Sequence, residues 1–142
     1  DTMALHRLTA RLLAELPGAV HTLRDPTRGG VATTLNEIAA SAGLAITLQD
    51  AALPIRPQVR AACELLGLEP LYLANEGKCL VIVSGDKAQE ALQLLRSLPE
   101  GKDAAIIGSL GPGKADRVSI TTPIGGARVV SPLHGMPLPR IG

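Results

Sequence analysis

The stretch Asp25-Pro26-Thr27-Arg28-Gly29-Gly30 decides the fold, because it joins two patterns of different periodicity. Residues 19–23 before it form a largely apolar run, which predicts a strand over 19–24, whereas an apolar stripe at helical spacing begins at Val31. A glycine pair at a strand-to-helix turn lets the backbone approach a ligand closely, and the helix directs unpaired N–H groups at that turn. With a carboxylate at Asp25 and a guanidinium at Arg28, the turn is either an anion site, with phosphate the expected ligand, or a plain capped helix start.

Helical and strand patterns alternate along the rest of the chain, which then finishes in strands. Helices are predicted over residues 3–16, 30–42, 57–67 and 86–97, and strands over residues 19–24, 45–49, 78–84, 105–108, 118–121 and 128–130. This order predicts an α/β (α+β) layered domain, with a mixed sheet of about six strands flanked by helices. We expect one domain over residues 1–131 and a Pro-rich extended tail over residues 132–142.

The patterns also predict which side chains face the core. The residues expected to face inward from the third helix are Val59, Ala62, Cys63 and Leu66. The nearly all-apolar strand 78–84 is expected to be buried on both faces, and Asp86 to cap the helix that follows it. The glycine-rich residues 108–113 follow a strand but precede no helix, so they favour a connection between strands over a phosphate loop.

Composition excludes several classes of function. The net charge is +1 and the only aromatic residue is Tyr72, so the chain lacks the basic field and the stacking platforms of a nucleic-acid binder. No apolar run reaches membrane-spanning length, and we expect no membrane partner. Cys63 and Cys79 lie in apolar segments, which predicts buried reduced thiols and a cytoplasmic protein. The three histidines show no ligand spacing with each other or with the cysteines, so no metal site is predicted.

A second candidate lies in the segment Asn75-Glu76-Gly77-Lys78, which precedes the apolar strand. Its glycine predicts a turn before that strand. Glu76 is either a carboxylate held at the mouth of the sheet, where it could act as a general base, or a solvated turn charge beside Lys78. The local pattern alone favours the solvated charge.

Three segments together resemble the C-terminal half of the HypE family of hydrogenase maturation proteins. They are Asp25-Pro26-Thr27-Arg28-Gly29-Gly30, Ala74-Asn75-Glu76-Gly77 and the ending Pro137-Leu138-Pro139-Arg140-Ile141. HypE belongs with aminoimidazole ribonucleotide synthetase and selenophosphate synthetase. The resemblance covers essentially the whole chain, and the ending is more specific to HypE than the glycine turn is.

The resemblance implies that the intact protein is an ATP-dependent carbamoyl dehydratase, a lyase. Its reaction would convert an S-carbamoyl group on a C-terminal cysteine to thiocyanate, which supplies a cyanide ligand for nickel–iron hydrogenase. The implied cofactors are ATP and Mg, and the implied partners are HypF, the HypC–HypD complex and a second copy of the intact protein. The chain by itself is expected to be monomeric, with no tightly bound cofactor.

Carried onto this chain, the resemblance assigns roles residue by residue. Candidates for the wall of the ATP phosphate site are Asp25, Thr27, Arg28, Gly29 and Gly30. Glu76 becomes the candidate catalytic base, and the tail from about Pro132 becomes a swinging arm. The family ends in Pro-Arg-Ile-Cys, whereas this chain ends in Gly142, and the family's N-terminal nucleotide-binding half is absent. We therefore expect the chain alone to be inactive.

Two other functions stay open. One is another kinase or synthetase of the same superfamily, using the same glycine turn, although the Pro-Leu-Pro-Arg-Ile ending argues against it. The other is a module that docks a protein partner without chemistry of its own. A pull-down with the isolated chain distinguishes the second from an enzyme fragment that has no partner.

Overall fold

Two compact units make up the chain. The computed structural model describes residues 3–114 and 116–132. The first unit comprises Asp1–Pro26 and Asn75–Ile106, and the second comprises Thr27–Ala74 and Ile107–Gly142. The chain therefore passes from the first unit to the second inside the quoted stretch, between Pro26 and Thr27.

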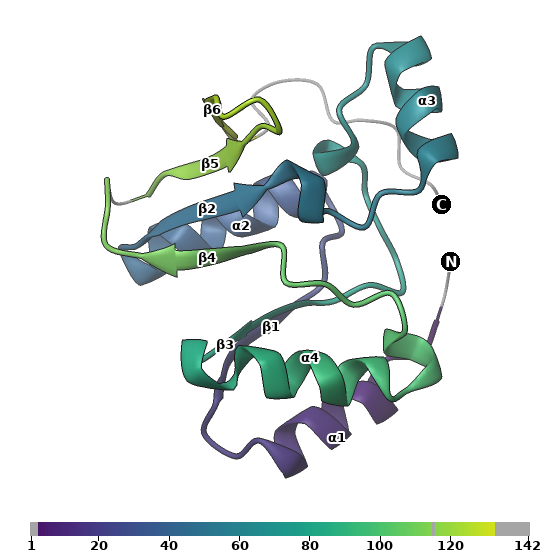
Figure 1. Ribbon diagram of the computed structural model, residues 1–142, viewed down its shortest axis with the longest axis vertical. Helices are drawn as coiled ribbons and strands as arrows, with labels where there is room; N and C mark the ends of the chain where they lie inside the picture. The colour runs from purple at the N-terminus through teal and green to yellow at the C-terminus, as the bar shows by residue number, and fades with distance from the viewer. Residues whose placement is uncertain (1–2, 115, 133–142) are drawn as a thin grey trace. The chain divides into compact units, whose positions relative to one another are not determined.

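The first unit packs two helices against a two-stranded antiparallel sheet (Figure 1). Its elements are α1 (His6–Glu15), β1 (Val20–Arg24), β3 (Leu80–Val83), α4 (Ala88–Arg96) and the 3-10 turns η3 (Gly85–Lys87) and η4 (Pro99–Gly101). Its core consists of Leu12, Leu16, Ala19 and Ala91, packed against Val20, Leu23, Val81, Val83, Leu94 and Leu95. Arg24 pairs with Leu80, so the end of β1 and the start of β3 lie together.

Two expectations for this unit are wrong in detail. All residues of β3 are half-buried rather than buried on both faces, because within the described residues the strand has one neighbour, β1. Asp86 does not cap α4: it lies inside η3, and Lys87 occupies the cap position without a side-chain hydrogen bond that caps the helix. A 3-10 turn at the start of a helix moves the cap by one or two residues, which the sequence pattern does not show.

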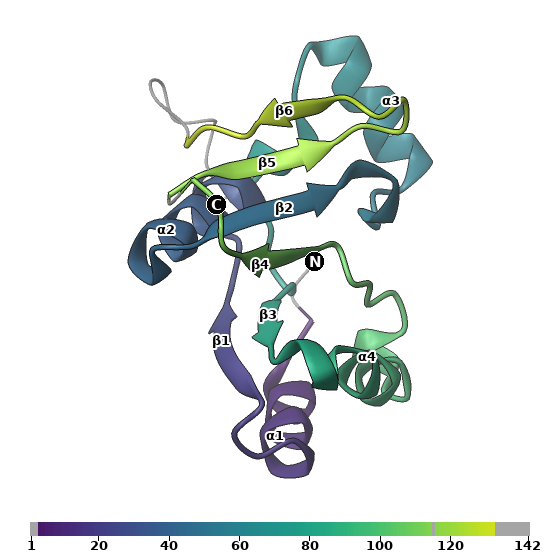
Figure 2. The same ribbon diagram turned by 60° about the vertical axis from the view of Figure 1, so that its left-hand side comes forward.

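The second unit is a four-stranded mixed sheet with α2 packed on it (Figure 2). Its elements are α2 (Gly30–Ala42), β2 (Ala45–Gln49), η1 (Asp50–Ala52), α3 (Pro57–Leu66), η2 (Pro70–Tyr72), β4 (Gly108–Gly111), β5 (Val118–Thr121) and β6 (Ala127–Val129). The strand order is β4-β2-β5-β6, with β2 and β5 parallel and the outer pairs antiparallel. The buried side chains include Ala32, Leu35, Ile38, Ala39, Ile46, Leu48, Val118, Ile120 and Val130.

The predicted α+β class and strand number are confirmed, but the six strands of the described residues form two sheets rather than one. The fourth strand is also displaced: β4 occupies residues 108–111, where a connection between strands is predicted, instead of 105–108. A Cβ on Gly108 would lie 2.2 Å from the carbonyl oxygen of Thr47. Because Gly108 has no side chain, the backbones of β4 and β2 can pair at this close distance. This pairing outweighs the low strand propensity of glycine.

The third helix is exposed where the sequence predicted burial. In α3 only Cys63 is buried, whereas the side chain of Leu66 is 67% exposed and that of Val59 is 40% exposed. Within the described residues α3 contacts mainly η2, which is too short to cover a helix face. No helix in the described part of the chain has the length and hydropathy of a membrane-spanning segment.

Candidate phosphate-binding turn and general base

Left-handed backbone explains why the turn before α2 carries two glycines. Gly29 has φ 74° and Gly30 has φ 63°, values that side-chain-bearing residues rarely adopt. The Gly30 N–H donates to the Thr27 carbonyl at 3.1 Å, which closes the turn. Gly29 occupies the cap position, and no side chain caps the helix. The start of α2 therefore offers N–H groups and the positive end of the helix dipole without a capping side chain.

A side chain at each of the two glycines would collide with different residues. A Cβ on Gly30 would lie 2.4 Å from the carbonyl oxygen of Leu71 and 2.6 Å from that of Leu73, so this buried glycine allows α2 to pack against η2. A Cβ on Gly29 would lie 2.1 Å from the hydroxyl oxygen of Thr33. Gly30 thus has no side chain because the backbone of Leu71–Leu73 lies against it, and Gly29 has none because a side chain there would collide with Thr33.

Thr33 is a candidate that sequence reasoning missed. Its hydroxyl oxygen is buried and has no hydrogen-bond partner among the described residues. Such an atom is costly to bury unless something satisfies it. The signal that could have found it is the spacing: Thr33 lies four residues after Gly29, one helical turn onward, and so faces the same turn.

The other predicted residues of the turn are accessible to different degrees. Thr27 is half-buried, whereas Arg28 and Asp25 are exposed. Thr27 and Arg28 belong to the second unit, and Asp25 belongs to the first.

Within the first unit, the two predicted segments meet at one end of the β1–β3 pair. The N–H of Asn75 donates to the carbonyl of Pro26 at 3.0 Å, which holds the loop before β3 against the end of β1. Glu76 is exposed in this loop, and Gly77 after it has φ 65°. The Lys78 ammonium donates to the side-chain oxygen of Asn75 rather than pairing with Glu76. The loop thus presents the Glu76 carboxylate to solvent beside the segment that carries Asp25.

The pKa of the Cys79 thiol is raised by its surroundings at this end of the sheet. Burial raises the pKa of the Cys79 thiol, a hydrogen bond with the Arg24 backbone partly opposes this, and the negative charge of Asp25 raises the pKa further. Asp25 is therefore close enough to act on the thiol. Cys63, in the other unit, is a buried thiol, and neither cysteine forms a disulfide.

We expect Cys79 to react slowly with iodoacetamide at neutral pH, because the thiolate is the nucleophile and a raised pKa keeps the group protonated. The rate should rise about tenfold per pH unit until the pH passes that pKa. Asp25→Asn should accelerate the reaction by removing the charge that disfavours the thiolate. Peptide-level mass spectrometry measures this, with the more buried Cys63 as the internal control. Reactivity equal to that of an exposed cysteine at neutral pH would contradict the assignment.

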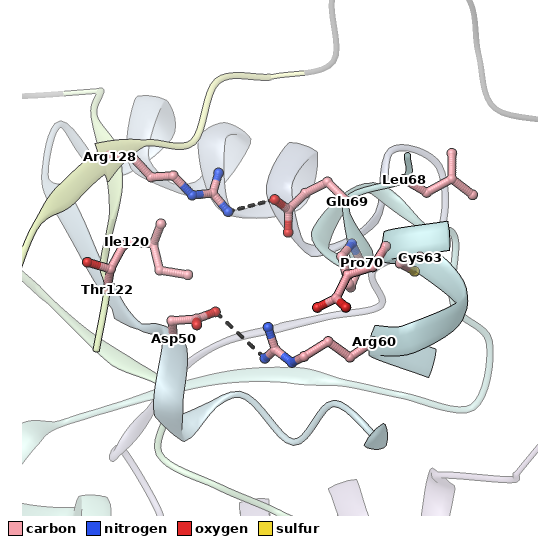
Figure 3. A pocket seen from close by; sticks show the side chains of 10 residues that line it. Asp50, Arg60, Cys63, Leu68, Glu69, Pro70, Ile120, Thr122 and Arg128 are labelled. Carbon is pink, nitrogen blue, oxygen red and sulfur yellow. Dashed lines mark hydrogen bonds and ion pairs between the residues drawn. The ribbon is translucent and has the colours of Figure 1, made fainter. Parts of the chain in front are cut away.

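A pocket of about 240 Å³ lies elsewhere in the second unit (Figure 3). It is lined by Asp50, Arg60, Cys63, Glu64, Leu68, Glu69, Pro70, Ile120, Thr122 and Arg128. Two ion pairs cross it, Arg60–Asp50 at 3.8 Å and Arg128–Glu69 at 2.7 Å. No predicted site residue lines it. Among the described residues, no group of three or more His, Cys, Asp or Glu side chains could hold a metal ion.

The predicted tail falls almost wholly outside the described residues. Ser131 and Pro132 are described and exposed, whereas residues 133–142, with the Pro-Leu-Pro-Arg-Ile segment and Gly142, are not.

Curated relatives align with nearly the whole chain. Carbamoyl dehydratase HypE of Azotobacter vinelandii is 48% identical over 141 residues, which cover 99% of this chain and 41% of that protein. Carbamoyl dehydratase HypE of Cupriavidus necator is 51% identical over 141 residues, covering 99% of this chain and 40% of that protein. The chain thus spans about two fifths of the length of these relatives.

Solved structures of the same name share the fold. A crystal structure of hydrogenase maturation protein HypE matches with a TM-score of 0.91 and 46% identity, over 98% of this chain and 45% of that one. A structure of HypE in complex with ATP matches at 0.80 and 45%, over 87% and 38% of the two chains. A HypE–HypF complex matches at 0.88 and 41%, over 94% and 43%.

These matches confirm the resemblance drawn from the three segments. Residues 2–121 match the family described as AIR synthase related protein, C-terminal domain. The chain belongs to this family, the C-terminal domain of AIR synthase related proteins.

Proposed function

We propose that this chain is the C-terminal domain of an ATP-dependent carbamoyl dehydratase that acts in hydrogenase maturation. The observation that carries the proposal is the alignment of 99% of the chain with carbamoyl dehydratases at about half identity. The left-handed Gly29–Gly30 turn adds a chemical reason, since no side chain caps the start of α2 and a helix N-terminus attracts anions. Because a similar protein has been solved in complex with ATP, we propose that the anion bound at this turn is the phosphate chain of a nucleotide.

The reaction would remove one water molecule from an S-carbamoyl cysteine and leave a thiocyanate, the source of a cyanide ligand. ATP, when bound, supplies the phosphoryl group that makes the amide oxygen a leaving group. The start of α2 and the Arg28 guanidinium would hold the negative charge of the phosphates. The buried Thr33 hydroxyl would donate to the same anion. The amide nitrogen loses two protons in all: one would pass to solvent when the oxygen is phosphorylated, and the Glu76 carboxylate would accept the other as the phosphate departs and the carbon–nitrogen triple bond forms.

Partners and location follow from the same proposal. HypF is the proposed donor of the carbamoyl group, supported by the HypE–HypF complex among the similar structures. We also propose the HypC–HypD complex as acceptor, a homodimer for the longer protein, Mg with the ATP, and a cytoplasmic location. No Mg ligands are assigned in this chain, given the lack of a suitable cluster among its described residues.

The test uses a longer protein, in which this chain carries Gly142→Cys and is joined to the part of the Cupriavidus necator relative that it does not cover. After carbamoylation, ATP should cause the mass loss of one water from the C-terminal peptide. The same protein with Gly142 retained should show no loss. Absence of any loss from the carbamoylated cysteine protein would refute the proposed activity.

Arg28→Ala in this protein should raise the KM for ATP by about 10-fold or more, because a hydrogen bond to a charged group contributes about 1.5–3 kcal/mol. Arg56→Ala is the matched control: Arg56 is also exposed and also precedes a helix of the second unit, α3. An equal KM in the two variants would remove Arg28 from the phosphate site.

A further inference from the structure

The pocket of the second unit lies between a helical wall and a sheet wall (Figure 3). The helical wall, from α3 and the start of η2, carries Arg60 and Glu69. The sheet wall carries Arg128 on β6 and Asp50, which follows β2 directly. Each wall therefore contributes one cation and one anion, and each cation faces the anion of the opposite wall. All four residues belong to the second unit, so the pocket is formed within one compact unit.

The two ion pairs differ in how fully they satisfy their charges. Arg128 and Glu69 are hydrogen-bonded at 2.7 Å. The Arg60 guanidinium lies 3.8 Å from the Asp50 carboxylate, too far for a hydrogen bond, and neither side chain makes one with another described residue. The Arg60 side chain is 42% exposed and the Asp50 side chain is 26% exposed, so a ligand can reach both. Donors and acceptors are thus open to a ligand on facing walls.

The charge of the lining favours a ligand that is neutral overall but carries both signs. Three carboxylates, those of Asp50, Glu64 and Glu69, and two guanidiniums line the pocket, an excess of one negative charge. A simple anion would be repelled by this excess, and a simple cation would be repelled by the guanidiniums. A zwitterion can place its carboxylate on Arg60 and its ammonium on Asp50, and each contact would be a charge-assisted hydrogen bond.

Size and apolar lining narrow the class of zwitterion. The volume of about 240 Å³ is below the roughly 300–1,000 Å³ of pockets that take drug-sized ligands. Leu68, Pro70 and the buried Ile120 supply apolar surface. Tyr72, the only aromatic residue of the chain, does not line the pocket, so a flat heteroaromatic ring has no stacking partner there. These features fit an amino acid with an aliphatic side chain.

We propose that this pocket binds a free α-amino acid with an aliphatic side chain. Arg60 holds its carboxylate, Asp50 holds its ammonium, and its side chain lies on Ile120. The ligand would connect the helical wall to the sheet wall, a link that α3 otherwise lacks because within the described residues it contacts mainly η2. The pocket contains none of the residues assigned to the dehydration reaction, so the amino-acid site and the proposed function can fail separately.

The first test titrates this 142-residue chain with L-leucine and follows its backbone amides by NMR. We expect saturable shifts around Asp50, Arg60 and Ile120 with a Kd of about 1 mM, the strength expected of so small a ligand in a partly open site. Isocaproate lacks the ammonium and isoamylamine lacks the carboxylate, so each should bind at least about tenfold more weakly. Absence of saturable shifts with L-leucine, or equal binding of the three probes, would overturn the proposal.

Two variants locate the ligand. Arg60→Gln and Asp50→Asn should each weaken binding of L-leucine by about tenfold or more, because each removes one charged partner. The ion pair they break is partly exposed, so the Tm should change little. Arg56→Gln and Asp103→Asn are the matched controls, since both residues are exposed and neither lines the pocket. Unweakened binding in either pocket variant would overturn the assigned contacts.

Amide hydrogen exchange tests the link between the two walls. At about ten times its Kd, L-leucine should slow exchange in α3 about tenfold, because a ligand held by both walls stabilises the closed state by mass action. Exchange in α1, which belongs to the first unit, should stay the same. Unchanged exchange in α3 at saturating L-leucine would show that the ligand does not span the pocket, and would overturn the proposed binding mode.

Discussion

Glu76→Gln in the longer protein is expected to slow dehydration of the S-carbamoyl cysteine by about 10²–10⁴-fold, the contribution typical of a general base. The amide has nearly the shape of the carboxylate but cannot take a proton from the substrate nitrogen. Glu76 is exposed in the loop before β3, and the Lys78 ammonium is engaged by Asn75, so the replacement leaves no broken ion pair behind. The free energy of unfolding should therefore change by less than about 0.5 kcal/mol.

The measurement is single-turnover mass loss of water at saturating ATP, so that a change in nucleotide affinity does not enter. Glu64→Gln is the matched control: it replaces another exposed carboxylate, on α3 in the second unit, that no step of the proposed reaction uses. We expect that variant to react at the unsubstituted rate. Dehydration by Glu76→Gln within about threefold of the unsubstituted rate would exclude Glu76 as the base, since a general base contributes far more.

Gly30→Ala should lower the free energy of unfolding by about 3–5 kcal/mol, at the upper end for a single substitution, because backbone strain and a steric clash with backbone atoms add together. The left-handed φ of 63° costs an alanine about 1–2 kcal/mol. The larger part comes from the new Cβ, which would meet the carbonyl oxygens of Leu71 at 2.4 Å and Leu73 at 2.6 Å. Both are backbone atoms of the segment around η2, so neither can rotate away.

Gly43→Ala separates the two contributions. Gly43 ends α2 with φ 64°, nearly the same backbone conformation, but a Cβ on Gly43 would have no neighbouring atom within 4 Å. Urea denaturation should therefore show a loss of about 1–2 kcal/mol for Gly43→Ala and a clearly larger one for Gly30→Ala. If both variants lost the same free energy of unfolding, the contact between α2 and η2 at Gly30 would contribute nothing to stability.

Local pattern was enough to predict much of this chain. The helix α2 begins and ends at the predicted residues 30 and 42, and β5 covers the predicted residues 118–121. These successes share a cause: side-chain periodicity and turn glycines report backbone conformation over a few residues. The same holds for the glycine pair, whose left-handed conformation is a local property of the turn.

Tertiary structure decided what depends on residues far apart. It divided the strands between two sheets, placed β4 on a glycine-rich segment, and left the apolar face of α3 largely exposed. It also brought Asn75 to Pro26, left the Thr33 hydroxyl buried without a partner among the described residues, and joined Asn36 to Val130 across 94 positions. The sequence by itself determined where most of the helices and strands form, because local conformation follows from neighbouring residues. Which elements pair, and which polar atoms they bury or hold, follows from contacts that no local pattern encodes.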